Sequence, residues 1–425
     1  MNINEFINAI SAGAFDEQLK KLYGSSEKEL LKQKARYISA AEHFSFLFPE
    51  RDEVSVFSAP SYLKIGGNYN ENHGGCVLAA AVNPDIIAFV AFHNDGVIRY
   101  CSEEQENVEI QLNDAEVHEN ETGTTAELIR AIAAGFSETG VETGGFDAYI
   151  SSEIPAGERI DSAAVFEILI GTIIDKRYNS GQAKAEEIAE IGHYAEKNCF
   201  GKSGSIVDKL ASSVGGFVLV DFEDTVNPEL QSVPFDFANI GYSICIVNTT
   251  DNHSDINQDY VMASVDMKNI TSVFKAEFLR EVDEEDFYDR LPELRSSCDG
   301  SEILSAAYFF SENRRVFLEA DALCCGNTEE FFNLVNESVE VSATMLQNMP
   351  LYNKSDSQEI SLAIMMSRRI LCDCGAISVQ ASGTIAAFVP NYLTVDYCDN
   401  MNRIFGENRC RVLSFRSVGG IELSL

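Results

Sequence analysis

The sequence predicts a two-domain protein that contains both helices and strands. Its 425 residues are enough for two domains of ordinary size. Residues 3–48 and 286–348 carry apolar side chains at helical spacing, whereas residues 54–112 contain runs typical of strands. Hydrophobic residues make up 45% of the chain and charged residues 23%, as in soluble globular proteins.

Further helices and strands follow in order through the N-terminal half. Residues 124–138 form an amphipathic pattern typical of a helix, and GGFDAYI then predicts a strand that ends at Ile150. A Pro/Gly loop leads into a long apolar helix, and a second helix is expected over 181–198. The Asp95-Gly96 dipeptide is a hairpin signal between the strand patterns on either side of it.

The C-terminal half begins with a predicted strand, GYSICIVNTT, from Tyr242. Helices follow over 286–348, and Ile385 to Val389 predict another strand before the closing segment RVLSFRSVGGIEL. The acidic, proline-containing stretch after Phe222 is the best candidate for a domain boundary.

The charge balance argues against two classes of partner. The net charge is −36 and is spread along the chain, whereas nucleic acid and anionic membranes both require a basic face. No run of 18 apolar residues occurs, and the N-terminus lacks the pattern of a signal peptide. We therefore expect a protein without nucleic-acid or membrane partners.

The eleven cysteines indicate a reducing compartment. They are odd in number and lie mostly in apolar segments, where free cysteine behaves as a small hydrophobe. Cys324-Cys325 and Cys372-Asp373-Cys374 lack the paired Cys-x2-Cys spacing of a zinc site, so structural cysteine is the favoured interpretation.

One stretch carries the strongest functional signal. Residues 59–78, APSYLKIGGNYNENHGGCVL, predict a strand, a glycine-rich turn and a second strand. Two glycine pairs enclose six polar side chains, which could bind a small polar ligand. From spacing alone, a β-hairpin with a solvated tip is the simpler interpretation.

This stretch resembles the galactokinase signature APGRVNLIGEHTDYNGG in length and at both ends. Ala59-Pro60, Gly67 and Gly74-Gly75 match, and the resemblance continues from about Leu22 to the end of the chain. The chain is identified as a divergent member of the galactokinase branch of the GHMP small-molecule kinases. In place of the family residues that hold galactose hydroxyls, it has Asn68, Tyr69, Asn70, Glu71 and Asn72. The resemblance implies substrate binding by Asn68, Tyr69 and Glu71.

The second family motif, PxGxGLSSSA, cradles the ATP phosphates and resembles PAGERIDSAA, residues 155–164. The implied nucleotide-binding residues are Pro155, Gly157, Glu158, Arg159, Asp161, Ser162 and Ala163. The Asp161 carboxylate should repel phosphate unless a metal lies between them, and Arg159 could compensate by contacting phosphate. By itself the pattern also fits an ordinary loop with Asp161 or Ser162 as helix N-cap.

The next motifs imply a metal site and a catalytic base. AEKNCFG resembles the family's AENxFVG, so Glu196 with Ser162 is expected to hold Mg²⁺. GSIVDK resembles CGIMDQ, which aligns Asp208 with the catalytic aspartate and Lys209 with a glutamine. Without the resemblance, Glu196 and Asp208 would be interpreted as ordinary helix charges.

Three further residues are implied to belong to the sugar site. They are Gly204, Ser205 and Tyr260. The family arginine beside the reacting centre is replaced by Tyr62, which makes reduced or lost activity plausible. Lys64 and Lys209 are the neighbouring cations that could supply the missing charge.

The resemblance implies an α+β fold of two domains, residues 1–222 and 223–425, with the active site in the cleft between them. It implies an ATP- and Mg²⁺-dependent kinase that converts a monosaccharide, by default galactose, to the sugar 1-phosphate. The first alternative is a catalytically silent homologue that senses sugar or nucleotide and regulates a partner, and the second is a purely structural homologue that binds no small ligand. We expect a cytoplasmic monomer.

Overall fold

The computed structural model describes residues 1–102, 108–112, 124–154, 162–201, 204–249, 269–346, 358–372, 374–380 and 383–424. The helices within them are α1 (Ile3–Ser11), α2 (Asp16–Tyr23), α3 (Glu27–Leu47), α4 (Thr125–Glu138), α5 (Ser162–Tyr178), α6 (Ala185–Phe200), α7 (Ile206–Val214), α9 (Glu284–Asp289), α10 (Leu291–Ser297), α11 (Gly300–Cys324), α12 (Thr328–Met345), α13 (Gln358–Leu371) and α14 (Thr394–Phe405). The strands are β1 (Ser55–Gly66), β2 (Cys76–His93), β3 (Val97–Ser102), β4 (Val108–Gln111), β5 (Gly145–Ser152), β6 (Phe217–Asp221), β7 (Glu229–Val233), β8 (Tyr242–Asn248), β9 (Ala376–Gln380), β10 (Thr384–Pro390), β11 (Cys410–Leu413) and β12 (Ile421–Leu423).

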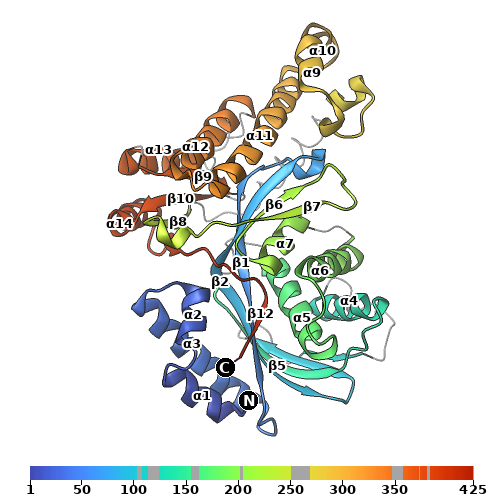
Figure 1. Cartoon of the computed structure of the whole chain (residues 1–425), viewed down its shortest axis with the longest axis vertical. Helices are drawn as coiled ribbons and strands as arrows, with labels where there is room; N and C mark the ends of the chain where they lie inside the picture. Colours follow the sequence, from blue (N-terminus) through green and yellow to red (C-terminus); the bar gives the residue numbers. More distant parts are fainter. Residues whose placement is uncertain are drawn as a thin grey trace.

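The strands form two sheets. The larger sheet has the order β12-β1-β2-β5-β3-β4, and β6 pairs with both β2 and β7. The smaller sheet has the order β11-β8-β10-β9. Helices α1–α3 cover one face of the larger sheet and α4–α7 the other (Figure 1). This mixture of separate helices and mainly antiparallel strands confirms the predicted α+β class.

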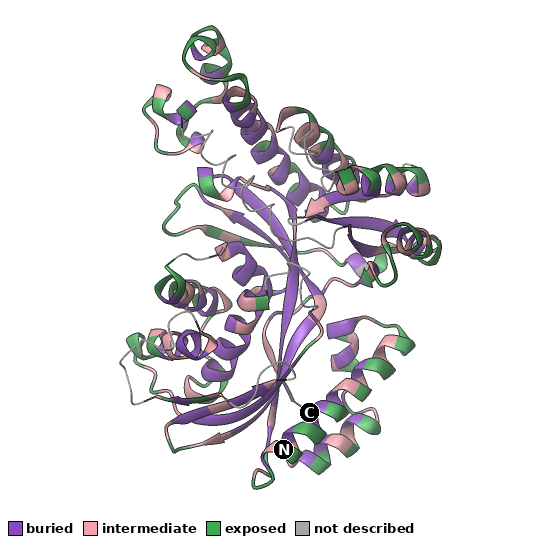
Figure 2. Ribbon diagram, turned by 180° about the vertical axis from the view of Figure 1, so that it is seen from behind, coloured by how far each residue is buried: buried purple, intermediate pink, exposed green. Residues whose placement is uncertain are grey.

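Strand periodicity explains how the larger sheet supports helices on both faces. Successive side chains of a strand point to opposite faces. Val56 and Phe89 therefore pack with α1–α3, whereas Phe57 and Val90 pack with α5 and the helices beside it. Most residues of the central strands β1 and β2 are buried (Figure 2), as expected of a sheet covered on both sides.

The turn at residues 94–96 does not join a paired hairpin. The prediction that the flanking strands pair is wrong, because β5 lies between β2 and β3. Strand β5 runs antiparallel to β2, from Ile86↔Ser152 to His93↔Gly145, and parallel to β3. The Asp-Gly signal locates a reversal of the chain, but it does not specify the neighbour of each strand.

The chain ends return to the larger sheet. β12 pairs with β1, and the two termini lie near each other in Figure 1. Strands β7 and β12 both follow residue 222 and still belong to this sheet, so the 222/223 boundary stays a prediction. The buried Arg416 guanidinium bonds Ser58 Oγ at 2.7 Å and lies 3.2 Å from Asp85, which ties the C-terminal segment to β1 and β2. Burial raises the pKa of Asp85, but the nearby Arg36 and Arg416 outweigh it and hold this pKa below its usual value.

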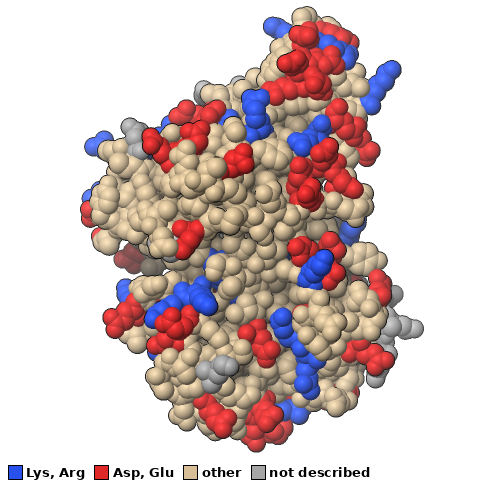
Figure 3. Space-filling model, viewed as in Figure 1, with Lys and Arg blue, Asp and Glu red and all other residues tan. Residues whose placement is uncertain are grey.

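The described helices include none that is both long and apolar enough to cross a membrane. Acidic side chains are spread over the face shown in Figure 3, with lysines and arginines between them. All eleven cysteines lie within the described residues, and each is free.

Candidate active site

The glycine-rich hairpin loop packs against helix α11. The Gly67 amide donates to Glu312 Oε1 at 3.0 Å, and the Cys76 amide donates to Asn313 Oδ1 at 2.7 Å. Asn70 and His73 are buried. The prediction of a solvated tip is therefore wrong, because long-range contacts with α11 cover the loop. Gly67 has φ +83°, and a Cβ there would collide with the Cys76 carbonyl, so only glycine fits.

The loop residues predicted to bind substrate face two different parts of the molecule. Asn68 Nδ2 donates to the Val379 carbonyl of β9 at 3.1 Å. Tyr69 has φ 73° and packs against the apolar cluster around Phe309. A left-handed tyrosine is uncommon, and such strained residues concentrate at functional sites. Glu71 instead faces helix α7.

Glu71 joins three other polar groups in a compact cluster. Its carboxylate accepts hydrogen bonds from the Ser205 hydroxyl and, at 3.3 Å, from the Ile206 amide. Lys64 Nζ lies 3.8 Å from Glu71 Oε2 and 3.2 Å from Asp208 Oδ1. The structure thus brings together Glu71, Ser205 and Asp208, three of the residues named from the sequence.

The local sequence explains these positions. Ser205 is the N-cap of α7, with its hydroxyl accepting from the Val207 amide at 3.2 Å, so Asp208 stands in the first turn of that helix. Lys64 stands on β1 two residues after Tyr62, and alternate strand residues share a face. The Lys64 ammonium therefore lies on the same side of β1 as Tyr62.

Lys209, the other candidate cation, is directed elsewhere. Its fully buried ammonium lies 2.8 Å from Glu196 Oε2 and 3.4 Å from Glu167 Oε2. Desolvation lowers the pKa of Lys209, but the Glu167 and Glu196 charges outweigh it and raise this pKa above its usual value. Lys209 therefore fastens α7 to α5 and α6. Glu167 was not singled out from the sequence, although a carboxylate inside the apolar run AVFEILIG was a usable signal.

Glu196 was expected to hold Mg²⁺, and its surroundings permit this through one oxygen. Oε2 accepts from Lys209 Nζ and from the Gly204 amide, both at 2.8 Å. No described residue donates to Oε1, which is the oxygen that can meet a cation. Ser162 is exposed at the first residue of α5, which packs against α6. A carboxylate oxygen and a hydroxyl are suitable Mg²⁺ ligands, so the donor set fits the ion.

Much of the predicted nucleotide site lies outside the described residues. Pro155, Gly157, Glu158, Arg159 and Asp161 belong to that part, and so does Tyr260 of the sugar site. Ser162 and Ala163 begin the 17-residue helix α5, and the N-terminal end of a helix carries the positive end of its dipole. The helix start is thus where the sequence places it, and its role in nucleotide binding stays a prediction.

Glu312 forms an ion pair at helical spacing within α11. Arg315 donates to Glu312 Oε2, whereas Arg314 pairs with Glu284. Glu312 also accepts from the Ser338 hydroxyl at 2.9 Å and from the Gly67 amide. This carboxylate links α11, α12 and the hairpin loop, so it supports the site rather than facing a ligand.

Comparison with known proteins agrees with this architecture. No family model matches the chain. The galactokinase of Streptococcus mutans is 24% identical over 363 residues, which cover 82% of this chain and 90% of that protein. A galactokinase of Lactococcus lactis is 23% identical over 362 residues, covering 82% of this chain and 88% of that protein.

Solved structures show the same fold. The crystal structure of Lactococcus lactis galactokinase complexed with galactose has a TM-score of 0.74 at 20% identity, covering 91% of this chain and all of that one. The mevalonate kinase of Methanococcus jannaschii has a TM-score of 0.61 at 15% identity, covering 85% and 98%. The resemblance found in the sequence is confirmed: the chain is a divergent homologue of the galactokinases and shares the α+β fold of the GHMP kinases.

Proposed function

We propose that the protein is a galactokinase-like sugar kinase that transfers the γ-phosphoryl group of ATP to a monosaccharide, with galactose as the default substrate and the sugar 1-phosphate as product. The observation that supports it best is the pairing of Lys64 with Asp208 beside Glu71 and Ser205. These groups combine a carboxylate base, a nearby cation and hydrogen-bonding partners for hydroxyls. Phosphoryl transfer requires functional groups of these kinds.

In this proposal Asp208 accepts the proton of the attacking sugar hydroxyl. Lys64, 3.2 Å from that carboxylate, stabilises the charge that develops on the transferring group, in place of the cation missing at Tyr62. Glu71 and the backbone around Gly204 and Ser205 orient the sugar. Asn68 and Tyr69 close the hairpin side of the site.

Glu196 Oε1 and the Ser162 hydroxyl would hold Mg²⁺, which supplies charge neutralisation on the phosphate oxygens. Residues 155–161 and Ala163 would surround the phosphates at the start of α5, and Tyr260 would contact the sugar. We expect the enzyme to be cytoplasmic, in keeping with its eleven free cysteines, and monomeric.

The first experiment is calorimetric titration of Mg-ATP with and without galactose, followed by an assay of ADP release over a panel of monosaccharides. Magnesium-dependent saturable binding and sugar-dependent ADP release are expected. Sugar binding without nucleotide binding would instead identify a catalytically silent sensor, and binding of neither ligand would refute both ideas.

The second experiment tests the base. Asp208→Asn should lower kcat by roughly 10²–10⁴-fold, the usual contribution of a general base, while leaving the folded structure intact. Asp289→Asn, in the short helix α9 away from this cluster, is the matched control. A kcat for Asp208→Asn equal to that of the unmodified protein would show that another group accepts the proton.

A further inference from the structure

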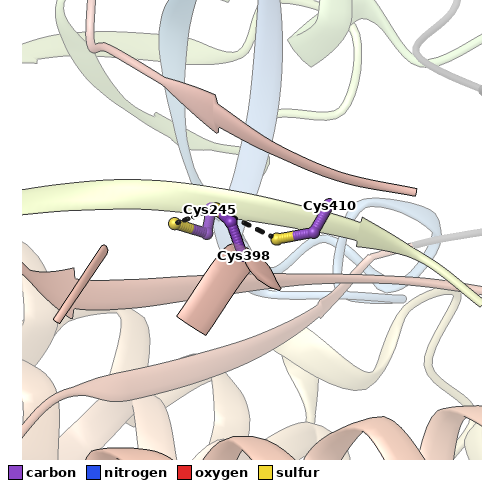
Figure 4. A group of neighbouring side chains, drawn as sticks. All are labelled: Cys245, Cys398 and Cys410. Atoms are coloured by element: carbon purple, nitrogen blue, oxygen red, sulfur yellow. Dashed lines mark hydrogen bonds between the residues drawn. The ribbon is translucent and has the colours of Figure 1, made fainter. Parts of the chain in front are cut away.

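Three cysteines from distant parts of the sequence meet beneath the smaller sheet. They are Cys245 of β8, Cys398 of α14 and Cys410 of β11, drawn in Figure 4. The Cys398 sulfur lies 3.9 Å from that of Cys245 and 3.5 Å from that of Cys410. All three sulfur atoms lie within 4.8 Å of one another.

The strand register shows that Cys245 and Cys410 are not placed to form a disulfide with each other. Cys245 pairs with Val412, and Cys410 pairs with Val247, so the two cysteines are diagonal neighbours on one face of the sheet. Diagonal neighbours have Cα atoms about 7–8 Å apart, beyond the reach of a disulfide without movement of the backbone. Cys398 lies over this pair from α14.

The position of α14 is itself fixed by the backbone of β11. Asn402 Oδ1 accepts from the Cys410 amide at 2.7 Å, and Asn402 Nδ2 donates to the Cys410 carbonyl at 3.5 Å. Asn402 follows Cys398 by four residues, so the same helical face carries the thiol and the amide that anchors it. The thiol geometry is therefore held by contacts that do not involve sulfur.

The three cysteines lie in apolar surroundings that exclude solvent except on the side of Cys398. Cys245 and Cys410 are buried together with Tyr397 and Met401, whereas Cys398 is only half-buried and offers an entry path. Among the residues that the structure describes, no histidine or carboxylate joins the three sulfurs. A purely sulfur site selects soft ions such as Cu⁺ and Zn²⁺ over Mg²⁺ or Ca²⁺.

The separations suit one ion held by three thiolates. Metal–sulfur bonds to Zn²⁺ are about 2.3 Å, so three sulfurs placed evenly around one ion lie about 4 Å apart. The two separations from Cys398, 3.9 and 3.5 Å, lie within about 0.5 Å of that value, and the third does not exceed 4.8 Å. We propose that Cys245, Cys398 and Cys410 bind one thiophilic d¹⁰ ion, Cu⁺ or Zn²⁺, as three thiolates, the thiol protons passing to solvent.

The site would act on the fold rather than on phosphoryl transfer. Ile244 and Ile246 of β8 face the main core, whereas Cys245 faces away from it toward α13 and α14. The ion would fasten edge strand β11 to β8 and α14. Strand β11 leads directly to Ser414, whose amide donates to Asn83 Oδ1 of β2 at 2.7 Å. The ion would therefore also stabilise the contact between this segment and the larger sheet.

The test uses the full-length protein, reduced and stripped of metal under anaerobic conditions. It is loaded separately with Cu⁺ and with Zn²⁺, each buffered by a competing chelator, and bound metal is counted after gel filtration. One ion per chain is expected for at least one of the two metals, and the preferred metal identifies the occupant. The midpoint of thermal unfolding should rise on loading, since an ion that binds only the folded state stabilises it.

Cys398→Ser is the discriminating variant, because this half-buried position tolerates a hydroxyl. It should weaken binding at least about 100-fold, beyond the range typical of losing an outer-sphere partner, and abolish the thermal shift. The matched control replaces the exposed Cys372 and Cys374 with serine and should keep the ion. X-ray absorption of the loaded unmodified protein should show three sulfur neighbours, which tests the site even if the variant misfolds.

The proposal is overturned if neither metal binds the reduced protein at one equivalent. It is overturned equally if Cys398→Ser retains the ion, or if the Cys372/Cys374 control loses it.

Discussion

Two lysines flank Asp208, one in space and one in sequence, and their surroundings differ sharply. Lys64 has 23% of its side chain exposed and lies between Asp208 and Glu71, where a ligand could displace or share it. Lys209 is wholly buried between Glu167 and Glu196. The sequence resemblance proposed both lysines as sources of positive charge near Tyr62, and their burial distinguishes them.

The difference shows that the burial of a lysine determines whether its charge stabilises the fold or is available to a ligand. A buried cation held by the buried Glu167 and the partly buried Glu196 has no freedom to follow a substrate, and removing it leaves the Glu167 carboxylate buried without a counter-charge. A partly exposed cation beside a carboxylate contributes little to stability, because water already solvates it. Lys209 should therefore matter to folding and Lys64 to chemistry.

The largest expected effect follows from Lys209→Met. The substitution keeps the length of the side chain but leaves Glu167 and Glu196 without their common cation. Loss of one partner from a buried pair costs about 3–5 kcal/mol, which should appear as a lower urea midpoint. Lys197→Met, on the exposed side of α6, should change the free energy of unfolding by less than about 0.5 kcal/mol.

A Lys209→Met protein as stable as the original would contradict the assignment of Lys209 as a structural cation. The comparison of the two lysines would then fail. Glu167→Gln combined with Lys209→Met should recover part of the loss, because it removes one of the carboxylates left without a counter-charge.

Lys64→Met is the converse test and rests on the proposed kinase activity. We expect kcat to fall roughly 10²–10³-fold, the usual loss when one group that stabilises transition-state charge is removed. The free energy of unfolding, measured by urea titration, should change by less than about 1 kcal/mol, since the pair is partly exposed. Lys28→Met, on the exposed surface of α3, is the control for loss of a positive charge.

An equal loss of stability and activity in Lys64→Met would remove the distinction between the two lysines. Unchanged kcat would mean that the Lys64 charge does not assist phosphoryl transfer. The charge would then have to come from another residue, such as Arg159.

These two lysines also mark what the sequence could predict. Resemblance to the galactokinase motifs drew attention to the hairpin loop, Asp208 and Glu196, and their roles stay predictions. The partners of Lys209 could not be deduced, since Glu167 is 42 residues away in another helix and meets it only when α5, α6 and α7 pack. Long-range contacts also overturned the solvated hairpin tip, which α11 buries.

The same limit applies elsewhere in the fold. Turn chemistry located the reversal at residues 94–96, but insertion of β5 between the flanking strands depends on the whole sheet. The cysteine cluster could not be predicted from the sequence for a similar reason. Its members are separated by 153 and 12 residues, whereas the sequence drew attention to neighbouring pairs such as Cys324-Cys325.

Glu319 of α11 extends the comparison to a buried carboxyl that no cation among the described residues hydrogen-bonds. It is fully buried beside Gly66 of the hairpin, and neither of its oxygens has a hydrogen-bond partner among the described residues. Burial, with repulsion from Glu312, raises its pKa well above the usual value, although Arg315 opposes this. The folded protein should therefore keep this carboxyl protonated at pH values where the unfolded chain has released the proton.

It follows that Glu319 lowers the stability of the fold as the pH rises above the unfolded pKa, by up to about 1.4 kcal/mol per pH unit until the folded pKa is reached. Glu319→Gln, a neutral isostere, should remove this dependence. Urea midpoints of the variant should match those of the original protein near pH 4 and exceed them at pH 8, whereas exposed Glu142→Gln should leave the pH profile unchanged. If Glu319→Gln were equally destabilising at both pH values, the carboxyl would be charged in the fold, and a cation would have to lie against it as Lys209 lies against Glu167.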